Sequence, residues 1–329
     1  MNHRVRAAVV GAGYLGRFHA LKYTQLPGVE LVAVVDIEEE RARSLASEVG
    51  ACPLRDARQL VGVVDIATVA VPTTQHYQVA KVLMEAGVHL LVEKPLAASL
   101  EEGEELVELS RSKGTVLQVG HVERFNSTIR ELRKRISEPL FAECERISPY
   151  PGRGSDVDVI LDVMIHDIDL VMDIFQGPPQ DLEAVGVPVM TSTFDMVNAR
   201  LKFPKGKVAN LTASRVSSKS FRKVRVFQPD LYLSADCLKG EIQWFMRVRN
   251  EGEKAPPSII GQTIEVPKGD ALLEEVKSFL DAVITGKKPV VDGETGLSSL
   301  RVALAIRENA ERNFPEELKR LLVPCEEEK

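Results

Sequence analysis

Three ionisable side chains recur at helical spacing near the middle of the chain. Asp162, His166 and Asp169 stand at positions i, i+4 and i+7 of an apolar segment, so a helix would carry all three on one face. Histidine titrates near neutral pH and can take a proton from an alcohol. The spacing therefore predicts that His166 and Asp162 form an acid–base pair. A solvated acidic helix face is the alternative, and a metal site is disfavoured because the sequence supplies no evident third ligand.

A lysine stands where a buried strand is expected to end. In Glu93-Lys94-Pro95 the proline keeps Lys94 out of helical angles and ends the strand. An ammonium group at that edge can hold a substrate oxygen and stabilise the negative charge that develops on it. A solvated lysine beside a turn is the alternative.

A glycine-rich turn near the N-terminus has the spacing GxGxxG. Gly11, Gly13 and Gly16 follow a predicted strand and open a predicted helix, which is the context that gives the spacing meaning. The first glycine permits the tight turn, the second lets the backbone approach a pyrophosphate, and the third allows close helix–strand packing. The phosphates would lie at the positive end of the helix.

The choice of cofactor depends on the residues at the end of the second strand. A carboxylate at Asp36 can accept hydrogen bonds from both ribose hydroxyls and would repel a 2′-phosphate. Ile37 follows where NADP enzymes often carry a basic side chain, although Arg41 and Arg43 come later in the same helix. We therefore predict NAD, with NADP as the alternative. The predicted cofactor-binding residues are Gly11, Gly13, Tyr14, Leu15, Gly16, Asp36, Pro72, His76, Glu93 and Lys94.

Several polar residues are weaker candidates. His76 begins the helix after the third strand and could lie beside the nicotinamide, although a lone histidine more often caps a helix or packs in a core. Arg124 and Asn126 lie at the expected domain junction, where they could bind substrate or serve as hinge contacts. Arg215 opens a basic run that extends to Arg225, which could hold a substrate phosphate or form a solvated sheet edge.

The elements that must position these residues fall into two groups. Over the first 120 residues, short apolar strands alternate with helices, which is the pattern of a doubly wound parallel sheet in a Rossmann domain. The strands are expected at 5–10, 31–35, 63–71, 88–92 and 115–119, with helices at 14–25, 38–49, 75–86 and 100–112. Ligands of such sheets bind at the carboxyl edge of the strands. We assign residues 1–121 to a dinucleotide-binding Rossmann domain.

The pattern changes after residue 121. Helices are expected at 122–135 and 160–175, and the segment from 182 to 266 reads mainly as hairpin-linked strands. Two helices, 270–285 and 295–313, close the chain. We assign residues 122–329 to an α+β domain with one large, mostly antiparallel sheet that would bind substrate and support oligomerisation.

Composition narrows the class of protein. The 329 residues include 42 Lys plus Arg against 48 Asp plus Glu, and 44% are hydrophobic, which excludes a mainly disordered chain and argues against nucleic-acid binding. No apolar stretch approaches the roughly 20 residues that cross a bilayer, so no membrane partner is expected. The four cysteines show no CxxC spacing, and we expect free thiols in a cytoplasmic protein.

Taken together, the motifs resemble the Gfo/Idh/MocA oxidoreductase family, the group of glucose–fructose oxidoreductase and inositol dehydrogenase. The glycine-rich turn, Asp36, Glu93-Lys94-Pro95 and the Asp162-x-x-x-His166 helix carry the resemblance, which covers nearly the whole chain. It implies an NAD-dependent dehydrogenase that transfers hydride between a secondary hydroxyl of a sugar and nicotinamide. It also implies a homodimer or homotetramer that pairs through the exposed face of the C-terminal sheet.

The resemblance further implies roles for single residues. Lys94, Asp162 and His166 match the catalytic constellation, and either Lys94 or His166 is the base. Lys94, Arg124, Asn126, Asp162, His166 and Arg215 are the predicted substrate-binding residues. Met164 departs from the family pattern, which commonly has glycine there.

The substrate expectation is narrower still. Residues 120–126 and 164–169 are similar to a branch that oxidises the 3-hydroxyl of UDP-N-acetylhexosamines. A dehydrogenase of a free sugar, inositol or another small carbonyl compound is one alternative. A non-catalytic NAD-binding regulator is the other, although a regulator has no need of the catalytic constellation.

Overall fold

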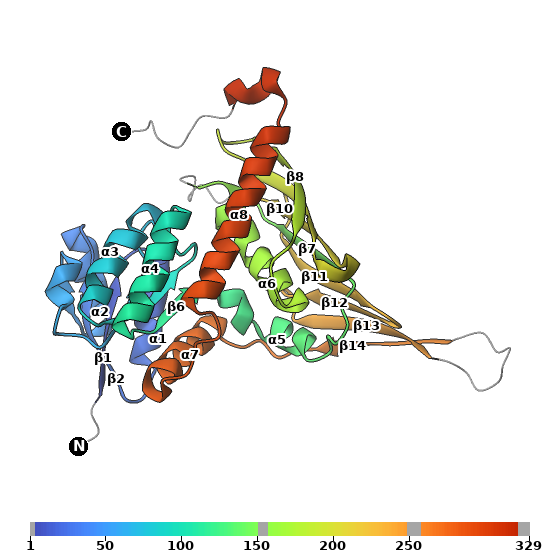
Figure 1. Cartoon of the computed structure of the whole chain (residues 1–329). Coiled ribbons are helices and arrows are strands. Elements are labelled where there is room, and N and C mark those ends of the chain that lie inside the picture. Colours follow the sequence, from blue (N-terminus) through green and yellow to red (C-terminus); the bar gives the residue numbers. More distant parts are fainter. Residues whose placement is uncertain (1–3, 151–156, 249–257, 322–329) are drawn as a thin grey trace. The chain divides into compact units, whose positions relative to one another are not determined.

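The computed structural model describes residues 4–150, 157–248 and 258–321 (Figure 1). The chain forms two compact units, one of residues 1–125 with 270–300 and one of residues 126–269 with 301–329. Within the described ranges, no helix is both long enough and apolar enough to span a bilayer.

The first unit is built on a parallel sheet with the strand order β3-β2-β1-β4-β5-β6. Its strands are β1 (Val5–Val10), β2 (Val29–Val35), β3 (Cys52–Leu54), β4 (Ile66–Val69), β5 (His89–Glu93) and β6 (Leu117–Gly120). The connecting helices are α1 (Tyr14–Thr24), α2 (Glu39–Val49), α3 (Thr73–Glu85) and α4 (Leu100–Lys113), with the 3-10 turn η1 (Ala57–Leu60). The Rossmann prediction is confirmed. The sequence missed only β3, a three-residue strand that contains Pro53.

Both faces of this sheet are covered, which explains why its strands are apolar throughout. Ala8 and Val10 of β1 face a core that includes Leu83 of α3, whereas Ala7 and Val9 face a core that includes Phe279. Phe279 belongs to α7 (Ala271–Thr285), which therefore packs on the first unit. The structure thus differs from the predicted boundary at residue 121, because the chain returns to the Rossmann sheet to complete one of its cores.

The second unit is built on an eight-stranded sheet with the order β14-β13-β12-β11-β7-β10-β9-β8. The strands are β7 (Phe141–Ile147), β8 (Asp181–Val187), β9 (Met196–Lys202), β10 (Val208–Ser214), β11 (Phe221–Gln228), β12 (Leu231–Asp236), β13 (Glu241–Val248) and β14 (Ser258–Glu265). Neighbours pair antiparallel except β7 and β10, which are parallel. The mostly antiparallel sheet is as predicted, but no strand was expected where β7 lies.

Helices flank one face of this sheet in Figure 1. They are α5 (Ser127–Arg133) and α6 (Ile165–Phe175), the latter preceded by the π-helical turn η3 (Ile160–Met164). The short turns η2 (Val122–Phe125), η4 (Pro204–Gly206) and η5 (Glu316–Leu321) and the long helix α8 (Gly293–Asn313) complete the structure. The predicted helix 122–135 is interrupted, because the Asn126 side chain accepts a 2.9 Å hydrogen bond from the Thr128 N–H and starts a new helix.

The basic run after Arg215 does not form a sheet edge. β11, which carries most of it, lies between β7 and β12 in the middle of the sheet. Its Arg225 pairs with Glu143 and Glu145 of β7, at 2.5 and 2.9 Å. The expectation of a solvated edge is therefore wrong, because β11 is paired on both sides. Carboxylates on the neighbouring strand β7 compensate the charge of Arg225.

Candidate active site

The glycine-rich turn passes directly from β1 into α1. Gly11 has φ +100°, and a Cβ at that position would lie 2.4 Å from the carbonyl oxygen of Ala70. A Cβ at Gly16 would lie 1.7 Å from the carbonyl oxygen of Gly11. Both glycines are therefore required by the fold itself, because no side chain fits at either position.

Gly13 differs from these two glycines. It is exposed, it caps α1 with φ −75°, and no protein atom lies within 4 Å of a Cβ built there. No side chain caps the helix and its first turn carries no acidic residue. The first-turn N–H groups are therefore directed at whatever approaches this end of α1, and an anion is the complementary partner.

Asp36 organises the adjacent loop. It follows β2, and its carboxylate accepts hydrogen bonds from the N–H groups of Ala12 at 2.7 Å and Glu38 at 2.9 Å. These two bonds tie the glycine-rich turn to the end of β2 and fix the direction of the carboxylate. The side chain of the next residue, Ile37, is exposed.

A groove of about 1040 Å³ runs along this edge of the sheet, where the strand order reverses. Five predicted cofactor residues line it, namely Gly11, Gly13, Leu15, Asp36 and Pro72. Gly16 is buried, and the exposed Tyr14 ring packs edge-on against Phe18. A glycine cradle, a free helix end and a carboxylate fit the pyrophosphate and ribose of a dinucleotide.

Two arginines of the groove were not anticipated. Arg55 follows β3, and Arg58 lies in η1. Because the sequence signal for β3 was weak, the segment after it was not expected at the carboxyl edge. Arg55 lies 3.4 Å from Glu39, and Arg58 lies 2.6 Å from Asp56.

His76 braces the turn that contains Lys94, and it does not line the groove. The ring is buried, and its Nδ1 and Nε2 atoms lie 2.8 Å from the carbonyl oxygen of Pro95 and 2.9 Å from that of Val71. Burial lowers the pKa of His76, although both carbonyl contacts oppose that shift. Both ring nitrogens are engaged in the interior, so the structure gives His76 a supporting role, and its contact with the cofactor stays a prediction.

Glu93 is likewise directed inwards. Its Oε1 atom lies 2.6 Å from Nε2 of His19, and its Oε2 atom accepts a 3.3 Å hydrogen bond from the Lys94 N–H. Burial opposes its ionisation, but His19 and Lys94 hold the pKa of Glu93 below its ordinary value. The carboxylate of Glu93 is thus used inside the unit, and its contact with the cofactor stays a prediction. Lys94 itself is half-buried and precedes a cis peptide bond.

The acid–base pair predicted from helical spacing lies in the second unit. Asp162 belongs to η3 and His166 to α6, and both side chains are half-buried. The carboxylate of Asp158 starts this segment by accepting from the N–H groups of Ile160 and Leu161. The structure thus places Asp162 within a π-helical turn that leads directly into the helix of His166.

The remaining positions of that segment are structural. Met164, which stands where the family commonly has glycine, is fully buried, and so is Asp169. Asp167 forms a buried ion pair with Arg146 of β7, with its Oδ1 atom 2.7 Å from Nη2. Sequence reasoning missed this pair because it missed β7. The bond fixes α6 on the sheet and thereby sets the orientation of Asp162 and His166.

Arg215 is committed to the interior of the second unit. Its side chain is 1% exposed, and Nε donates to Asp195 Oδ1 at 2.8 Å. Although burial opposes ionisation of Asp195, Arg215 and three backbone N–H groups lower the pKa of that carboxyl to about 2. Arg215 is therefore withdrawn from the predicted substrate-binding residues, because its guanidinium also bonds Val157, Thr191 and Thr193.

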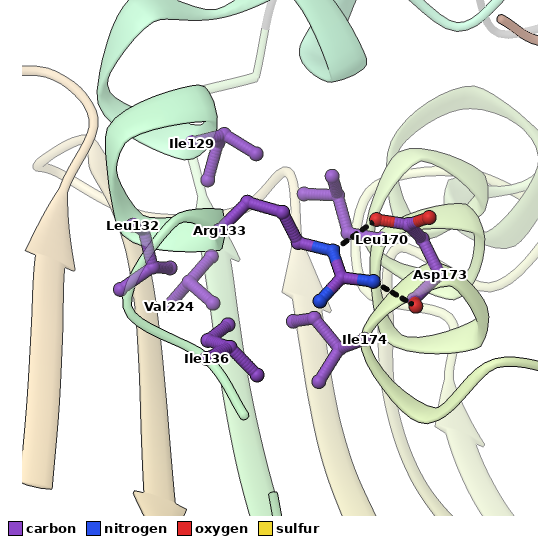
Figure 2. Close-up of a pocket in the computed structure, with 8 residues that line it drawn as sticks. All are labelled: Ile129, Leu132, Arg133, Ile136, Leu170, Asp173, Ile174 and Val224. Atoms are coloured by element: carbon purple, nitrogen blue, oxygen red, sulfur yellow. Dashed lines mark hydrogen bonds and ion pairs between the residues drawn. The ribbon is translucent and has the colours of Figure 1, made fainter. Parts of the chain in front are cut away.

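A hollow in the second unit is too small for a ligand. It measures about 10 Å³, which is room for one water molecule, and lies between α5 and α6 (Figure 2). Arg133 crosses it and donates to the Asp173 carboxylate at 2.7 Å and to the Asp173 carbonyl at 2.9 Å. The hollow therefore belongs to the packing of the two helices.

Comparison with known proteins agrees with this geometry. Residues 5–121 match a family model described as "Oxidoreductase family, NAD-binding Rossmann fold", and residues 121–230 match the "GFO/IDH/MocA C-terminal domain". The chain is 37% identical over 307 residues to UDP-N-acetylglucosamine 3-dehydrogenase of Acidithiobacillus ferrooxidans, covering 92% of this chain and 96% of that protein.

Solved structures show the same fold. A structure of the Acidithiobacillus ferrooxidans enzyme superposes with a TM-score of 0.87 at 34% identity, covering 97% of this chain and 99% of that one. Scyllo-inositol dehydrogenase of Lactobacillus casei, solved with NAD(H) and scyllo-inositol bound, gives a TM-score of 0.78 at 19% identity, covering 94% and 98%.

The glycines of the turn can be separated by substitution. In Gly13→Ala the added methyl meets no protein atom, so we expect the melting temperature without cofactor to stay within about 2 °C of wild type. The same methyl occupies the space that a pyrophosphate needs, so NAD affinity measured by calorimetry should fall at least about tenfold.

Gly16→Ala is the matched comparison. Its methyl collides with the Gly11 carbonyl, so this variant should melt well below wild type even without NAD. Normal NAD affinity in Gly13→Ala would show that the dinucleotide does not approach this turn.

Proposed function

We propose that this chain, which belongs to the Gfo/Idh/MocA family of NAD-binding oxidoreductases, oxidises the 3-hydroxyl group of a UDP-N-acetylhexosamine. The observation that carries this proposal is the whole-length similarity to the Acidithiobacillus ferrooxidans enzyme named for that reaction. The dinucleotide groove beside Asp36 supports the oxidoreductase half of the assignment. The product would be a 3-keto sugar.

NAD is the proposed cofactor, in preference to NADP. Asp36 presents a carboxylate whose direction is fixed by two backbone N–H groups, in the position that favours free ribose hydroxyls. Of the arginines in the groove, Arg55 and Arg58 already pair with Glu39 and Asp56. Their charges are therefore partly neutralised and offer less to a 2′-phosphate.

The chain supplies binding, orientation and proton transfer. Bound NAD⁺ supplies the acceptor for the hydride that leaves the sugar carbon. Lys94 holds the substrate oxygen and stabilises the negative charge that develops on it as the hydroxyl proton leaves. His166 takes the hydroxyl proton, so that the alcohol becomes a ketone, and Asp162 orients the imidazole ring. A lysine can also act as the base, and the pH dependence of the variants below separates the two assignments.

Arg124 and Asn126 remain candidates for sugar or diphosphate contacts. Both are half-buried in the described structure, at the end of η2 and at the N-cap of α5. Asn126 already uses its side-chain oxygen for the helix cap. Its amide N–H₂ group is the part that would donate to substrate.

A homo-oligomer is the proposed assembly. Four aromatic rings form a row across β7, β11, β12 and β13 in the second unit, namely Phe141, Phe227, Tyr232 and Phe245. Successive ring centroids lie 5.5, 4.8 and 6.1 Å apart, and the Phe245 side chain is 47% exposed. A second copy that presented the same face would bury this row against itself.

The substrate proposal is tested by following NADH formation with UDP-sugars, free sugars and inositols, using NAD and NADP in parallel. A 2-oxoacid is added to one series so that cofactor retained between turnovers is reoxidised. We expect turnover with UDP-N-acetylglucosamine and NAD. Turnover with a free sugar or inositol alone would leave the family assignment and reject the nucleotide-sugar substrate. NAD binding without any turnover would favour a regulator.

The catalytic roles are tested by His166→Asn and Lys94→Met. Each should lower kcat by about 10²- to 10⁴-fold while leaving the NAD dissociation constant unchanged, because neither side chain lines the dinucleotide groove. Loss of the base should also remove the acidic limb of the pH profile of kcat/KM. Lys113→Met, on the exposed end of α4, is the control. Near-normal turnover in both test variants would refute the mechanism.

Sedimentation of the protein should show a dimer or tetramer. Phe245→Asp places a charge in the aromatic row and should shift the protein towards the monomer. Ile284→Asp, at an exposed position of α7 in the first unit, should leave the assembly unchanged. A monomeric wild-type protein would contradict the proposed interface.

A further inference from the structure

Three titratable side chains meet in the interior of the first unit, next to Lys94 in the sequence. They are His19 of α1, Glu93 of β5 and Glu275 of α7, with exposures of 0%, 7% and 0%. One nitrogen or oxygen atom from each lies within 4.8 Å of those of the other two. Residues 93 and 275 are far apart in the chain, and α7 brings them together. We call this group the buried triad.

The charges of the buried triad do not balance if both carboxyl groups are ionised. Even a protonated His19 would compensate only one carboxylate. Glu93 has its partners in His19 and the Lys94 N–H, whereas no described residue donates a hydrogen bond to either oxygen of Glu275. An uncompensated carboxylate with no exposed surface is strongly unfavourable. The triad must therefore hold one further positive charge.

The geometry indicates that this charge is a proton. His19 Nε2 and Glu93 Oε1 lie 2.6 Å apart, which is a hydrogen-bond distance. Two ligands of one metal ion at bond lengths of about 2.0–2.2 Å lie farther apart, at about 3 Å or more. A proton on a carboxylic acid requires no such separation, and it supplies the donor that Glu275 otherwise lacks.

We propose that Glu275 is a positioning residue: it remains a protonated carboxylic acid, shares its proton with the Glu93 carboxylate, and thereby holds the Glu93–Lys94–Pro95 turn in place. Its effect on catalysis rests on the proposed role of Lys94. Burial first, and then the charge of Glu93, raise the pKa of Glu275 well above its ordinary value. Glu93 is the carboxyl that already has His19 and the Lys94 N–H beside it, so the proton belongs on Glu275, whose oxygens receive no hydrogen bond from the described residues.

The carboxylate of Glu93 is confined by the backbone of the neighbouring strand as well as by the buried triad. A Cβ at Gly120 of β6 would lie 2.9 Å from Glu93 Oε2, so the carboxylate lies directly against the backbone of the next strand. On the other side of the turn, His76 contacts the Pro95 carbonyl. The turn that carries Lys94 is thus braced from α1, α3, α7 and β6.

The groups facing the buried triad limit what else could titrate. Tyr23 of α1 bonds to Thr68 and its pKa is raised by burial. The charges of Lys94 and His76 lower the pKa of Glu93. Gln118 of β6 donates a 3.1 Å hydrogen bond to the backbone carbonyl of Glu275. Among the groups named here, Glu275 is the carboxyl whose pKa is raised. The stability of the protein should therefore fall as the pH rises from 5 to 8, because the unfolded chain releases this proton more readily than the folded protein.

Glu275→Gln tests the protonation state. Because the folded-state pKa of Glu275 is raised, its contribution to stability is complete below the unfolded pKa near 4.5 and is lost as pH rises towards the folded value. A neutral amide has no such loss. The melting temperature of Glu275→Gln minus that of wild type should therefore be near zero or negative at pH 5 and should rise by several degrees towards pH 8.

Matched variants separate this effect from general damage. Glu274→Gln, beside it on α7 and ion-paired to Lys277, should track wild type at every pH. Glu275→Met keeps the volume but supplies no donor to Glu93. It should lower kcat about tenfold or more with NAD affinity unchanged, and Glu275→Gln should restore most of that loss.

The outcome does not depend on the catalytic assignment. The melting series reports on the proton of Glu275 even if Lys94 proves dispensable, so failure of the two proposals is distinguishable. A pH-independent difference between Glu275→Gln and wild type would overturn the proposal. A stoichiometric metal ion in the purified protein, with a melting temperature that falls on chelation, would also overturn it.

Infrared spectroscopy of wild-type protein with isotope-labelled glutamate carboxyls requires no variant. A protonated glutamate at pH 8 supports the proposal, and the absence of one refutes it.

Discussion

The contact between Gly16 and the carbonyl of Gly11 is the constraint on which the first unit depends. The chain leaves β1 and enters α1 with no room for a side chain at either glycine. That tight passage brings the first turn of α1 to the carboxyl edge of the sheet. Asp36 then fastens the turn to the end of β2 through Ala12. The groove, the uncapped N-terminus of α1 and the position of the Asp36 carboxylate all follow from this one close approach.

Buried polar pairs play the equivalent part for the side chains proposed to be catalytic. Glu93, the residue before Lys94, contacts His19, and Asp167, the residue after His166, pairs with Arg146 of β7. Arg215 and Asp195 fix the loop that follows β8 through three backbone N–H groups. Desolvation makes each such pair costly to break, because the remaining partner would be a buried polar or charged group without its hydrogen bond. The half-buried residues that we propose to be catalytic are thus held in place by buried neighbours.

Family membership and local chemistry constrain the function at different levels. The matched family models account for the NAD-binding Rossmann unit and for much of the second unit, and they establish the oxidoreductase class. The substrate is a finer property that depends on a few side chains near the reacting carbon. Arg215 illustrates the difference. In the sequence, Arg215 resembled a ligand for a substrate phosphate. In the structure it is buried and bonds to Asp195.

The sequence by itself determined the parallel sheet, the glycine-rich turn, Asp36 at the end of β2 and the helical segment of Asp162 and His166. These features are local, since strand and helix periodicity and turn chemistry are encoded by neighbouring residues. Only the tertiary structure decided that α7 returns to the first unit, that β7 enters the second sheet, and that His76 and Glu93 face inwards. The same holds for the proximity of Glu275 to Glu93 and for the pairing of Arg215 with Asp195. Contacts between residues far apart in the chain depend on how whole elements pack, and no local spacing records them.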